Sequence, residues 1–405
     1  MERSFKELLE QKTAETEAAV YAYLPEEKGF QKTIFEAMNY SVKAGGKRLR
    51  PLLMMETYRM LGGKGKEILP FMAAIEMIHT SSLIHDDLPC MDNDELRRGK
   101  PTTWKVYGYD MAVLAGDALM IFAFETAAKA LSLGGDPERV ARAMGILAEK
   151  TGIYGMIGGQ TVDVELTGKP VPEEQLSFIY RLKTGALLEA SMRIGAVLAG
   201  VGKEEEETVE RIAADVGMAF QIQDDILDLV STAEVLGKPV LSDEKNEKTT
   251  YVTLKGLEKA KAEVKTLSDR AADALNSLPG DKEFLGTLIK TLVDREKCTG
   301  CGACAKACPN AIISIIPEHK RKPVVLCQNK DKGAQTRKAC SAGCIGCMKC
   351  AKACPKQAIT VENNLAYIDQ EKCVGCGLCV ERCVVDEPDV AIRIRTDAEH
   401  PRAGA

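Results

Sequence analysis

The sequence predicts a mainly α fold in two parts: a large all-α bundle over residues 1–296 and a small, cysteine-rich α+β domain after it. Long segments of the first part show helical periodicity, and strand-like alternation is scarce there. Only one of the 15 cysteines precedes residue 298. The net charge also changes, from −11 over residues 1–296 to +6 over residues 297–405. We therefore expect domains at 1–296 and 297–395, and a flexible tail at 396–405.

The composition indicates a soluble protein and argues against a membrane or nucleic-acid-binding protein. With 45% hydrophobic and 28% charged residues, the chain has the composition of a soluble globular protein. It has no uninterrupted apolar run near the ~20 residues that span a bilayer, and its start has no apolar signal core. We expect a cytoplasmic protein without a membrane span. The acidic balance of the first part argues against binding to nucleic acid.

The first part reads as about ten helices separated by turns. The segment 111–120 is apolar nearly all round, which favours a helix buried inside a large bundle. Glycine and proline clusters at 62–63, 134–137 and 278–280 predict turns between helices.

An acidic helix is predicted at 220–228 (FQIQDDILD). Gln221, Asp224, Asp225 and Asp228 stand at i, i+3, i+4 and i+7, so they share one face. Carboxylates this close repel one another in a dry interior, which favours a cation among them. Oxygen ligands favour Mg²⁺, which completes its shell with substrate phosphates and waters. The alternative is a solvated acidic face.

The first acidic cluster along the chain, Asp86, Asp87 and Asp92, lies upstream of this second one. Asp86 and Asp92 are six residues apart with Pro89 between them. On a regular helix they would point about 120° apart, so the helix must end or distort for both to reach one metal group.

Basic motifs accompany the acidic clusters. Lys47 and Arg50 follow two glycines, Arg97 and Arg98 follow the first acidic cluster, and Lys183 lies in an apolar helix. Such cations suit a metal-bridged diphosphate. The alternatives are a solvated basic turn at 45–51 and a Lys183 side chain that extends to solvent.

The order of motifs GGKRLR, DDLPCMD…RRGKPT, GGQ…D, KTG, FQIQDDILD, GKP and KTTY resembles the trans-isoprenyl diphosphate synthases, most closely the bacterial farnesyl and geranylgeranyl diphosphate synthases. The resemblance covers residues 1–296. It implies an all-α isoprenoid-synthase bundle, a homodimer, and a central cavity between two Mg²⁺-binding aspartate motifs. The implied reaction is the condensation of isopentenyl diphosphate with an allylic diphosphate.

The resemblance also assigns residues. The implied Mg²⁺ ligands are Asp86, Asp92 and Asp224, and the implied catalytic residues are Asp86, Asp87, Asp92, Lys183, Asp224, Asp225 and Asp228. The implied substrate-binding residues are Lys47, Arg50, His79, Arg97, Arg98, Lys183, Thr184, Gln221, Lys238 and Lys248. The loop at 237–243 departs from the family pattern, because Leu241 stands where members usually have glycine.

Ser81 and Ser82 are the predicted chain-length residues. Ser81 lies five positions before the first aspartate, where farnesyl-producing relatives often carry an aromatic residue that floors the cavity. We expect the small side chain to leave room for a C20 product.

The last 108 residues contain three runs of four cysteines. Each has the C-x₂-C-x₂-C-x₃-C spacing of bacterial ferredoxins, whose clusters are of the [4Fe–4S] type. The runs comprise Cys298, Cys301, Cys304 and Cys308; Cys344, Cys347, Cys350 and Cys354; and Cys373, Cys376, Cys379 and Cys383. Zinc is the alternative ligand, because CxxC pairs also form zinc ribbons.

Pairing between runs follows from the ferredoxin pattern, in which the fourth cysteine binds the other cluster of a pair. Cys383 would then join the second run, and Cys354 would join the third. The first run would draw its fourth ligand from Cys308, Cys327 or Cys340, or a combination of them. Fourteen cysteines are enough for three clusters and too few for four, so we expect three.

The insert at 323–333, the segment at 338–347 and the segment at 361–366 resemble the polyferredoxin region of the B subunit of Rnf-type ferredoxin:NAD oxidoreductases. This resemblance covers about 297–395 and implies electron transfer with an unknown redox partner.

Prenyl transfer is redox-neutral, so three explanations of the fusion stay open. The tail delivers electrons to another enzyme, for example an iron–sulfur step of isoprenoid precursor synthesis. Alternatively, the chain is mainly an Rnf-type electron-transfer protein with an accessory bundle. In the third view, two independent domains have been joined by accident.

Overall fold

The computed structural model of this 405-residue chain divides into two compact units, Met1–Thr299 and Gly300–Ala405. It describes residues 5–230 and 249–293 of unit 1, and residues 323–325, 345–362, 364–369, 372–374, 376, 378–381, 383 and 392–394 of unit 2. The expected domain boundary at 296/297 and the expected flexible tail at 396–405 lie outside the described residues.

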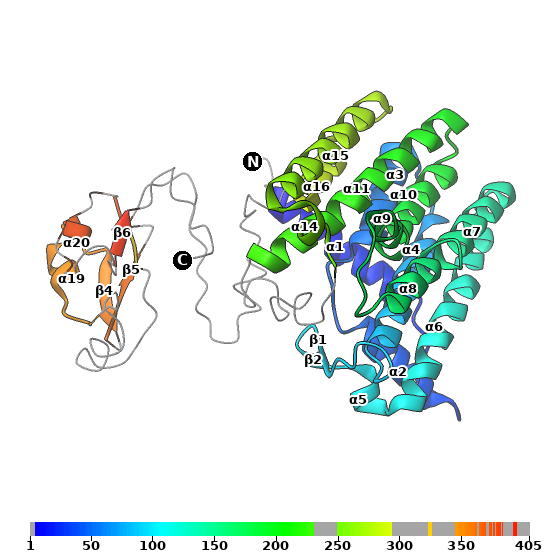
Figure 1. Cartoon of the computed structure of the whole chain (residues 1–405), viewed down its shortest axis with the longest axis horizontal. Helices are drawn as coiled ribbons and strands as arrows, with labels where there is room; N and C mark the ends of the chain where they lie inside the picture. Colours follow the sequence, from blue (N-terminus) through cyan, green and yellow to red (C-terminus); the bar gives the residue numbers. More distant parts are fainter. Residues whose placement is uncertain are drawn as a thin grey trace. The chain divides into compact units, whose positions relative to one another are not determined.

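Unit 1 is the expected all-α bundle (Figure 1). Its α-helices are α1 (Phe5–Tyr21), α2 (Lys32–Val42), α3 (Leu49–Met60), α4 (Ile68–Asp86), α5 (Thr103–Tyr107), α6 (Tyr109–Ala128), α7 (Pro137–Thr151), α8 (Met156–Glu165), α9 (Glu173–Ile179), α10 (Ala186–Ala199), α11 (Lys203–Val230), α14 (Tyr251–Lys255), α15 (Leu257–Ser277) and α16 (Glu283–Val293). A 3₁₀-helix, η1 (Lys129–Leu133), follows α6, and a π-helix, η2 (Tyr180–Gly185), joins α9 to α10.

Turn chemistry ends these helices where the sequence predicts. Gly134 has φ 89° after η1, and the Asp136 side chain accepts a hydrogen bond from the Arg139 backbone at the start of α7. Gly280, with φ 89°, follows α15. A Cβ atom at Gly280 would lie 1.8 Å from the Met60 carbonyl oxygen, so only glycine fits. The predicted turns at 134–137 and 278–280 are confirmed.

Helix α4 is the centre of the bundle. It packs against α6, α3 and α1, and most of its side chains are buried around its whole circumference. One hydrophobic cluster surrounds α4, α6 and α7, and a second joins α10, α11, α15 and α16. Side chains that project from the end of α4 are therefore carried by a helix that is packed on several sides.

The prediction that 111–120 is buried all round is wrong. Leu114 on α6 is 54% exposed, and Ile121, about two turns further along the helix, is 70% exposed. The buried positions of α6 are mostly small, with Ala112, Ala115 and Gly116 against α4. Small residues let the two backbones approach, which leaves the larger apolar side chains on the outer face.

Two helices among the described residues are long and apolar enough to cross a bilayer: Ile68–Asp86 and Tyr109–Leu133. The most apolar stretch of the first is 72% buried inside the bundle, against 39% for the second. Core helices of soluble proteins meet the same criteria, so length and composition carry little weight here.

A small antiparallel hairpin in unit 1, β1 (Leu96–Arg97) and β2 (Lys100–Pro101), follows the first acidic cluster. Its turn residues Arg98 and Gly99 have φ 55° and φ 75°. Positive φ at both central positions is the type I′ geometry that suits tight hairpins. The turn fixes the two neighbouring arginines, Arg97 and Arg98, on a short rigid element.

Unit 2 is a small α+β unit, as the sequence predicts. Strand β3 (Pro323–Val325) pairs with β6 (Ile392–Ile394), and β4 (Ile359–Glu362) pairs with β5 (Leu365–Ile368), both antiparallel. Two short helices carry cysteines, Cys350 on α19 (Lys349–Ala353) and Cys379 on α20 (Leu378–Glu381). These two cysteines are buried in one small core with Ile359 and Leu365.

Candidate functional site

The first acidic cluster lies where α4 ends. Asp86 is the last residue of α4, and the backbone N–H of Asp92 donates a hydrogen bond of 2.9 Å to the carbonyl of Asp86. The chain therefore doubles back, and Asp92 returns to the end of the helix. The expectation that the helix must end or distort here is confirmed.

Asp86 and Asp87 have different partners. Gln160 on α8 donates to Oδ1 of Asp86 at 2.8 Å, and Arg97 on β1 donates to Oδ1 of Asp87 at 2.6 Å. Burial raises the pKa of Asp86, and the positive charge of Lys183 opposes that rise. Burial also raises the pKa of Asp87, which the hydrogen bond from Arg97 opposes. Asp86 is thus directed towards α8, while Asp87 binds Arg97 and so joins the end of α4 to the β1–β2 hairpin.

Lys183 and Thr184 project from the π-helix η2. Gly159 of α8 packs directly against this turn, and a Cβ atom there would lie 2.2 Å from the backbone nitrogen of Lys183. The ammonium of Lys183 donates to Oδ2 of Asp163 at 2.6 Å, and the Lys183 side chain as a whole is 28% exposed. Burial lowers the pKa of Lys183, but the charges of Asp163 and Asp86 outweigh that effect and raise it. The Lys183 side chain therefore turns to Asp163 instead of extending to solvent. It also stands on a π-helical turn, a feature that often occurs at functional sites.

A cavity of about 710 Å³ joins these groups. Asp86, Gln160, Lys183 and Thr184 form part of its wall, and apolar side chains form much of the rest. Its lining also includes Arg50, His79, Ser82, Leu83, His85, Met91, Asp117, Met120, Met156, Ile157, Thr161, Val164, Glu165 and Leu187. An apolar space with a few charged groups at one place suits a long apolar ligand with a charged end.

The two predicted chain-length residues lie differently. Ser82 is on the wall of this cavity. Ser81 is fully buried, and its hydroxyl donates to the carbonyl of Ile78 at 2.8 Å. Ser82 is therefore the residue whose enlargement would fill the cavity directly.

The glycine-rich loop before α3 lies against the hairpin turn. Gly45 and Gly46 have φ 98° and φ 143°, and a Cβ atom on Gly46 would lie 2.9 Å from the Arg98 guanidinium. Arg98 donates to the carbonyl oxygen of Gly45. The structure thus brings together two basic motifs that are 53 residues apart, while Lys47 lies exposed on the same loop.

Arg50 and His79 form the inner end of this basic region. Burial lowers the pKa of Arg50 to about 10. Burial, reinforced by the charges of Arg50 and Arg98, lowers the pKa of His79 well below its ordinary value, so the imidazole is neutral at pH 7. Among the described residues, nothing accepts a hydrogen bond from the buried Nε of Arg50. An orphaned guanidinium donor beside a cavity suits an anionic ligand.

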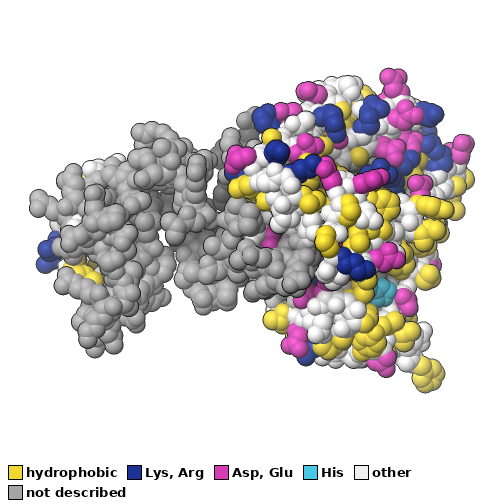
Figure 2. All heavy atoms as spheres, in the orientation of Figure 1, with side chains coloured by type: hydrophobic (Ala, Val, Ile, Leu, Met, Phe, Trp, Pro, Cys, Tyr) yellow, Lys and Arg dark blue, Asp and Glu magenta, His cyan; other side chains and the backbone are white. Residues whose placement is uncertain are grey.

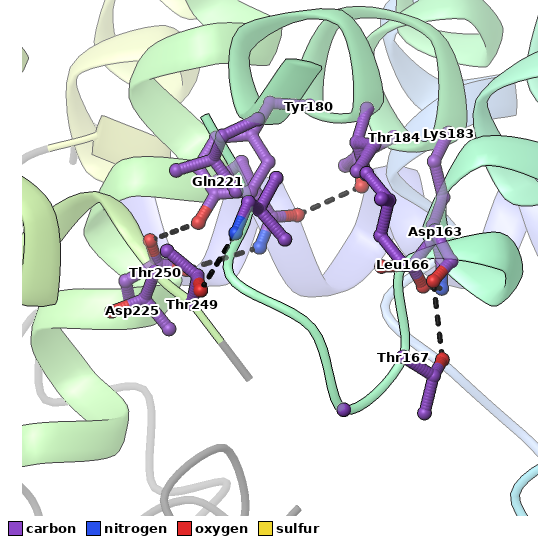
Figure 3. A pocket seen from close by; sticks show the side chains of 14 residues that line it. Asp163, Leu166, Thr167, Tyr180, Lys183, Thr184, Gln221, Asp225, Thr249 and Thr250 are labelled. Atoms are coloured by element: carbon purple, nitrogen blue, oxygen red, sulfur yellow. Dashed lines mark hydrogen bonds and ion pairs between the residues drawn. The ribbon is translucent and has the colours of Figure 1, made fainter. Parts of the chain in front are cut away.

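The second acidic cluster does not share one environment. On α11, Asp225 is 5% exposed, as is Asp228, while Asp224 is more open to solvent. Asp225 accepts a hydrogen bond from the Tyr180 hydroxyl (Figure 3) and another, at 3.0 Å, from the Tyr251 backbone. The shared face stays a prediction, and along it Asp225 and Asp228 are buried while Asp224 is less so.

A second, smaller cavity of about 110 Å³ lies on the other side of Lys183 and Thr184. Asp163, Gln221, Asp225 and Thr250 are among the residues that line it (Figure 3). Thr184 donates to the amide oxygen of Gln221 at 2.8 Å. The π-helix thus lies between the large cavity of Asp86 and the small cavity of Asp225.

Several predicted residues lie outside the described part of the chain. They are Lys238, Lys248, Cys298, Cys301, Cys304, Cys308, Cys327, Cys340 and Cys344, with Leu241 of the loop that departs from the family pattern.

Four cysteines of unit 2 meet at one small cavity. Its lining contains Cys354, Cys373, Cys376 and Cys379, which are the four that the spacing assigns to one cluster. The lining is otherwise largely apolar, and the Sγ atom of Cys354 accepts a hydrogen bond of 3.3 Å from the Ala358 backbone. Backbone donors to thiolate sulfur stabilise its negative charge and tune an iron–sulfur centre. Of the other set, the structure describes Cys347, Cys350 and Cys383.

The residues present fit both groups of cofactors. Among the described residues, no three His, Cys, Asp or Glu side chains converge on a point suited to a single ion. Mg²⁺ does not require this, because it is held by one or two carboxylates with substrate phosphates and waters. A [4Fe–4S] cluster does not either, because its four thiolates are spread around a cube of iron and sulfide. The apolar cavity ringed by four cysteines suits such a cluster.

The sequence analysis missed two residues that support the site. Tyr180 holds Asp225, and Arg48, next to Lys47, is fully buried. A tyrosine hydroxyl within a mostly apolar helix signals a buried partner, which is the clue that identifies Tyr180. The sequence carries no comparable signal that Arg48, the neighbour of exposed Lys47, has a fully buried side chain.

Comparisons with known proteins agree with this geometry. The family model "Polyprenyl synthetase" matches residues 31–282, "4Fe-4S dicluster domain" matches residues 343–386, and "4Fe-4S binding domain" matches residues 291–314. The two iron–sulfur models do not single out the Rnf-type subunit.

Individual relatives are similar over unit 1. The chain is 41% identical over 298 residues to the farnesyl diphosphate synthase of Geobacillus stearothermophilus, which covers 72% of this chain and 98% of the relative. It is 47% identical over 253 residues to the large subunit 1 of a heterodimeric geranylgeranyl pyrophosphate synthase from Arabidopsis thaliana, covering 62% of this chain and 68% of the relative.

Solved structures give the same result. An apo FPP/GFPP synthase from Zymomonas mobilis matches with TM-score 0.64 and 35% identity, over 71% of this chain and 98% of that one. A Helicobacter pylori geranyltransferase, solved with magnesium and isoprenyl diphosphate, matches with TM-score 0.63 and 31% identity, over 73% of this chain and 98% of that one. The chain therefore belongs to the polyprenyl synthetase family, as a prenyl diphosphate synthase with 4Fe-4S ferredoxin domains in its C-terminal part.

Proposed function

We propose that unit 1 condenses isopentenyl diphosphate with allylic diphosphates up to a C20 product, geranylgeranyl diphosphate. The observation that carries the product length is the cavity of about 710 Å³, whose wall contains the small side chain of Ser82. A cavity of this size, apolar over much of its wall, has room for a long prenyl tail. Relatives named for both C15 and C20 products are similar to this chain.

We assign the charged groups to two diphosphates. The allylic diphosphate lies among Arg97, Lys183, Thr184 and Gln221, with Lys238 and Lys248 from the segment that follows α11 in the sequence. Magnesium held by Asp86, Asp92 and Asp224 would, when bound, stabilise the negative charge of the departing diphosphate. Isopentenyl diphosphate lies among Lys47, Arg50, His79 and Arg98, where the free Nε donor of Arg50 supports an anion.

The chain's own residues then hold the reacting carbons. Lys183 and Arg97 stabilise charge that develops on the leaving oxygen, and they do so more effectively in a cavity with little water. The apolar wall keeps water from the allylic cation while the isopentenyl double bond attacks it. Neutral His79 contacts the second diphosphate as a hydrogen-bond donor without adding charge. The proton lost in the last step goes to the released diphosphate.

Replacement of Ser82 with phenylalanine tests the product length. The aromatic ring should occupy the cavity wall beside Leu83 and shift the product from C20 to C15 or shorter. Products from dimethylallyl and isopentenyl diphosphates, separated by chromatography after removal of the diphosphate, give the answer. Ser132→Phe, on the exposed end of η1, is the matched control and should leave the product unchanged. C15 alone from the wild-type protein would refute the proposed C20 product.

We propose that the C-terminal part carries three [4Fe–4S] clusters. The supporting observation is that Cys354, from the second run, lines one cavity with three cysteines of the third run. Anaerobically reconstituted protein should contain about twelve iron atoms per chain. Cys376→Ser should lower that number by up to four and leave helix content unchanged, because Cys376 is exposed and lies in unit 2. An iron content of about eight in the wild-type protein would contradict a third cluster.

The clusters suit transfer of single electrons to a separate enzyme, because prenyl transfer itself needs none. We propose a redox partner outside this chain and a cytoplasmic location. A second explanation of the fusion is that the chain is mainly an Rnf-type electron-transfer protein with an accessory bundle. A third explanation is that two independent domains have been joined by accident. Rates of prenyl transfer measured anaerobically with oxidised and with reduced clusters separate coupled from independent units.

We also propose that the chain is a homodimer. The outer face of α6 exposes Leu114 and Ile121, and nearby Ile153 and Tyr154 between α7 and α8 are 70% and 74% exposed. Figure 2 shows hydrophobic side chains over the part of unit 1 where α6 and α8 lie. A patch of this kind usually marks an interface. Sedimentation equilibrium that fits a monomer across the micromolar range would refute the dimer.

A further inference from the structure

Asp224 and Asp225 are adjacent carboxylates on α11, yet their surroundings differ. Successive helical residues point about 100° apart. Asp225 is 5% exposed and points towards the π-helix η2 and the start of α14, while Asp224 is more accessible. Two neighbouring aspartates that point in different directions and differ in burial need not have the same task.

The carboxylate of Asp225 accepts hydrogen bonds from three donors on three different elements, of which Figure 3 shows Tyr180 and Gln221. Oδ2 accepts from the Tyr180 hydroxyl of η2 and, at 3.0 Å, from the Tyr251 backbone of α14. Oδ1 accepts from Nε2 of Gln221, one turn earlier on α11, at 3.3 Å. An ionised carboxylate has about four acceptor positions, so most of this one's capacity is used within the protein.

The hydrogen bond to Gln221 continues to the π-helix. Because Nε2 of Gln221 donates to Asp225, its oxygen Oε1 is turned towards Thr184, whose hydroxyl donates to it at 2.8 Å. Thr184 is the neighbour of Lys183, which reaches into the large cavity beside Asp86. A continuous series of hydrogen bonds thus connects Asp225 to the turn that carries a diphosphate-binding cation.

We propose that Asp225 is a positioning residue rather than a magnesium ligand: it orients Gln221 and joins the π-helix of Lys183 and Thr184 to the start of α14. This inference rests on the proposed roles of Asp224 in magnesium binding and Lys183 in diphosphate binding. Asparagine at position 225 keeps the shape of the side chain but replaces one acceptor oxygen with a donor. It cannot accept from Tyr180, Tyr251 and Gln221 together.

The test compares Asp225→Asn with Asp224→Asn in the full-length protein. Asp225→Asn should lower kcat by about 10- to 100-fold, as loss of an orienting partner does, while the Mg²⁺ concentration for half-maximal rate stays within about twofold of the wild-type value. The KM for isopentenyl diphosphate should not change, because Arg50 and Arg98 lie elsewhere. Asp224→Asn should raise the half-saturating Mg²⁺ concentration by about tenfold or more.

Two results would overturn the proposal: an increase in the Mg²⁺ requirement of Asp225→Asn that matches that of Asp224→Asn, or a kcat equal to that of the wild type. Tyr180→Phe gives an independent reading if Asp225→Asn does not fold. It removes one donor to Asp225 and should lower kcat by about threefold to tenfold with no change in Mg²⁺ requirement, and an unchanged kcat counts against the proposal. An unchanged Mg²⁺ requirement in Asp224→Asn would refute the magnesium role of Asp224 separately.

Discussion

Asp86→Asn is expected to lower kcat by about 10²- to 10³-fold, the loss typical of removing one group that stabilises a charged transition state. Asp86 lies at the end of α4 and forms part of the wall of the large cavity. Its negative charge is attracted by the positive charge of Lys183. Asparagine would keep the contact with Gln160 at one atom but would supply no negative charge to a metal ion. Steady-state turnover of dimethylallyl and isopentenyl diphosphates measures the effect.

Glu95→Gln is the matched control for this change. Glu95 lies nine residues further along the same segment, is 65% exposed, and pairs only with Lys105 on the described part of the chain. The same loss of one carboxylate charge there should change kcat by less than about twofold, because an exposed pair contributes little. A kcat for Asp86→Asn within about tenfold of wild type would mean that Asp86 is not a magnesium ligand.

The spacing of Asp86 and Asp92 was enough to predict the end of α4, because a regular helix cannot direct both side chains to one place. The spacing of Asp224, Asp225 and Asp228 predicts one shared face, but it does not predict that Asp225 is more buried than Asp224. The partners of Asp225, Tyr180 and the start of α14, come from other parts of the chain. Helical spacing predicts a shared face and says nothing about what packs against each part of it.

Sequence periodicity also could not distinguish an apolar helix that is buried from one that is half exposed. Helices α4 and α6 are both long and apolar in sequence, yet on α6 the side chains of Leu114 and Ile121 are exposed. The difference comes from Gly116, because it lets α6 approach His85 on α4 so closely that a Cβ atom would lie 2.1 Å from the imidazole. The π-helical turn at Lys183 was not predicted either, because six residues are too few to establish a period in the sequence.

The basic motif at 45–51 depends on a buried residue that its sequence does not reveal. Arg48 has a fully buried side chain and φ 50°. Its guanidinium donates to Glu76 on α4 at 2.8 Å, to Glu17 on α1 at 3.0 Å and to the Val42 carbonyl at 2.7 Å. These contacts fix the start of α3, and through it the direction of Arg50 two residues later.

Arg48→Ala should therefore lower the free energy of unfolding of unit 1 by about 3–5 kcal/mol, because it leaves the buried carboxylate of Glu76 without its partner. Lys47→Ala, at the neighbouring exposed position, should change that free energy by less than about 0.5 kcal/mol while weakening substrate binding. Urea unfolding of the full-length protein, followed by helical circular dichroism, measures both, since most of the described helices belong to unit 1.

The double variant Arg48→Met with Glu76→Leu separates stability from position. Replacing both members of a buried pair with apolar side chains is often neutral or stabilising, so the double variant should recover much of the lost free energy. It should not recover the affinity for isopentenyl diphosphate, because the contacts that fix the start of α3 remain absent. A double variant that is stable and binds isopentenyl diphosphate as the wild type does would show that Arg48 only contributes stability. Weak binding in a stable protein would show that the buried Arg48 sets the geometry of Arg50.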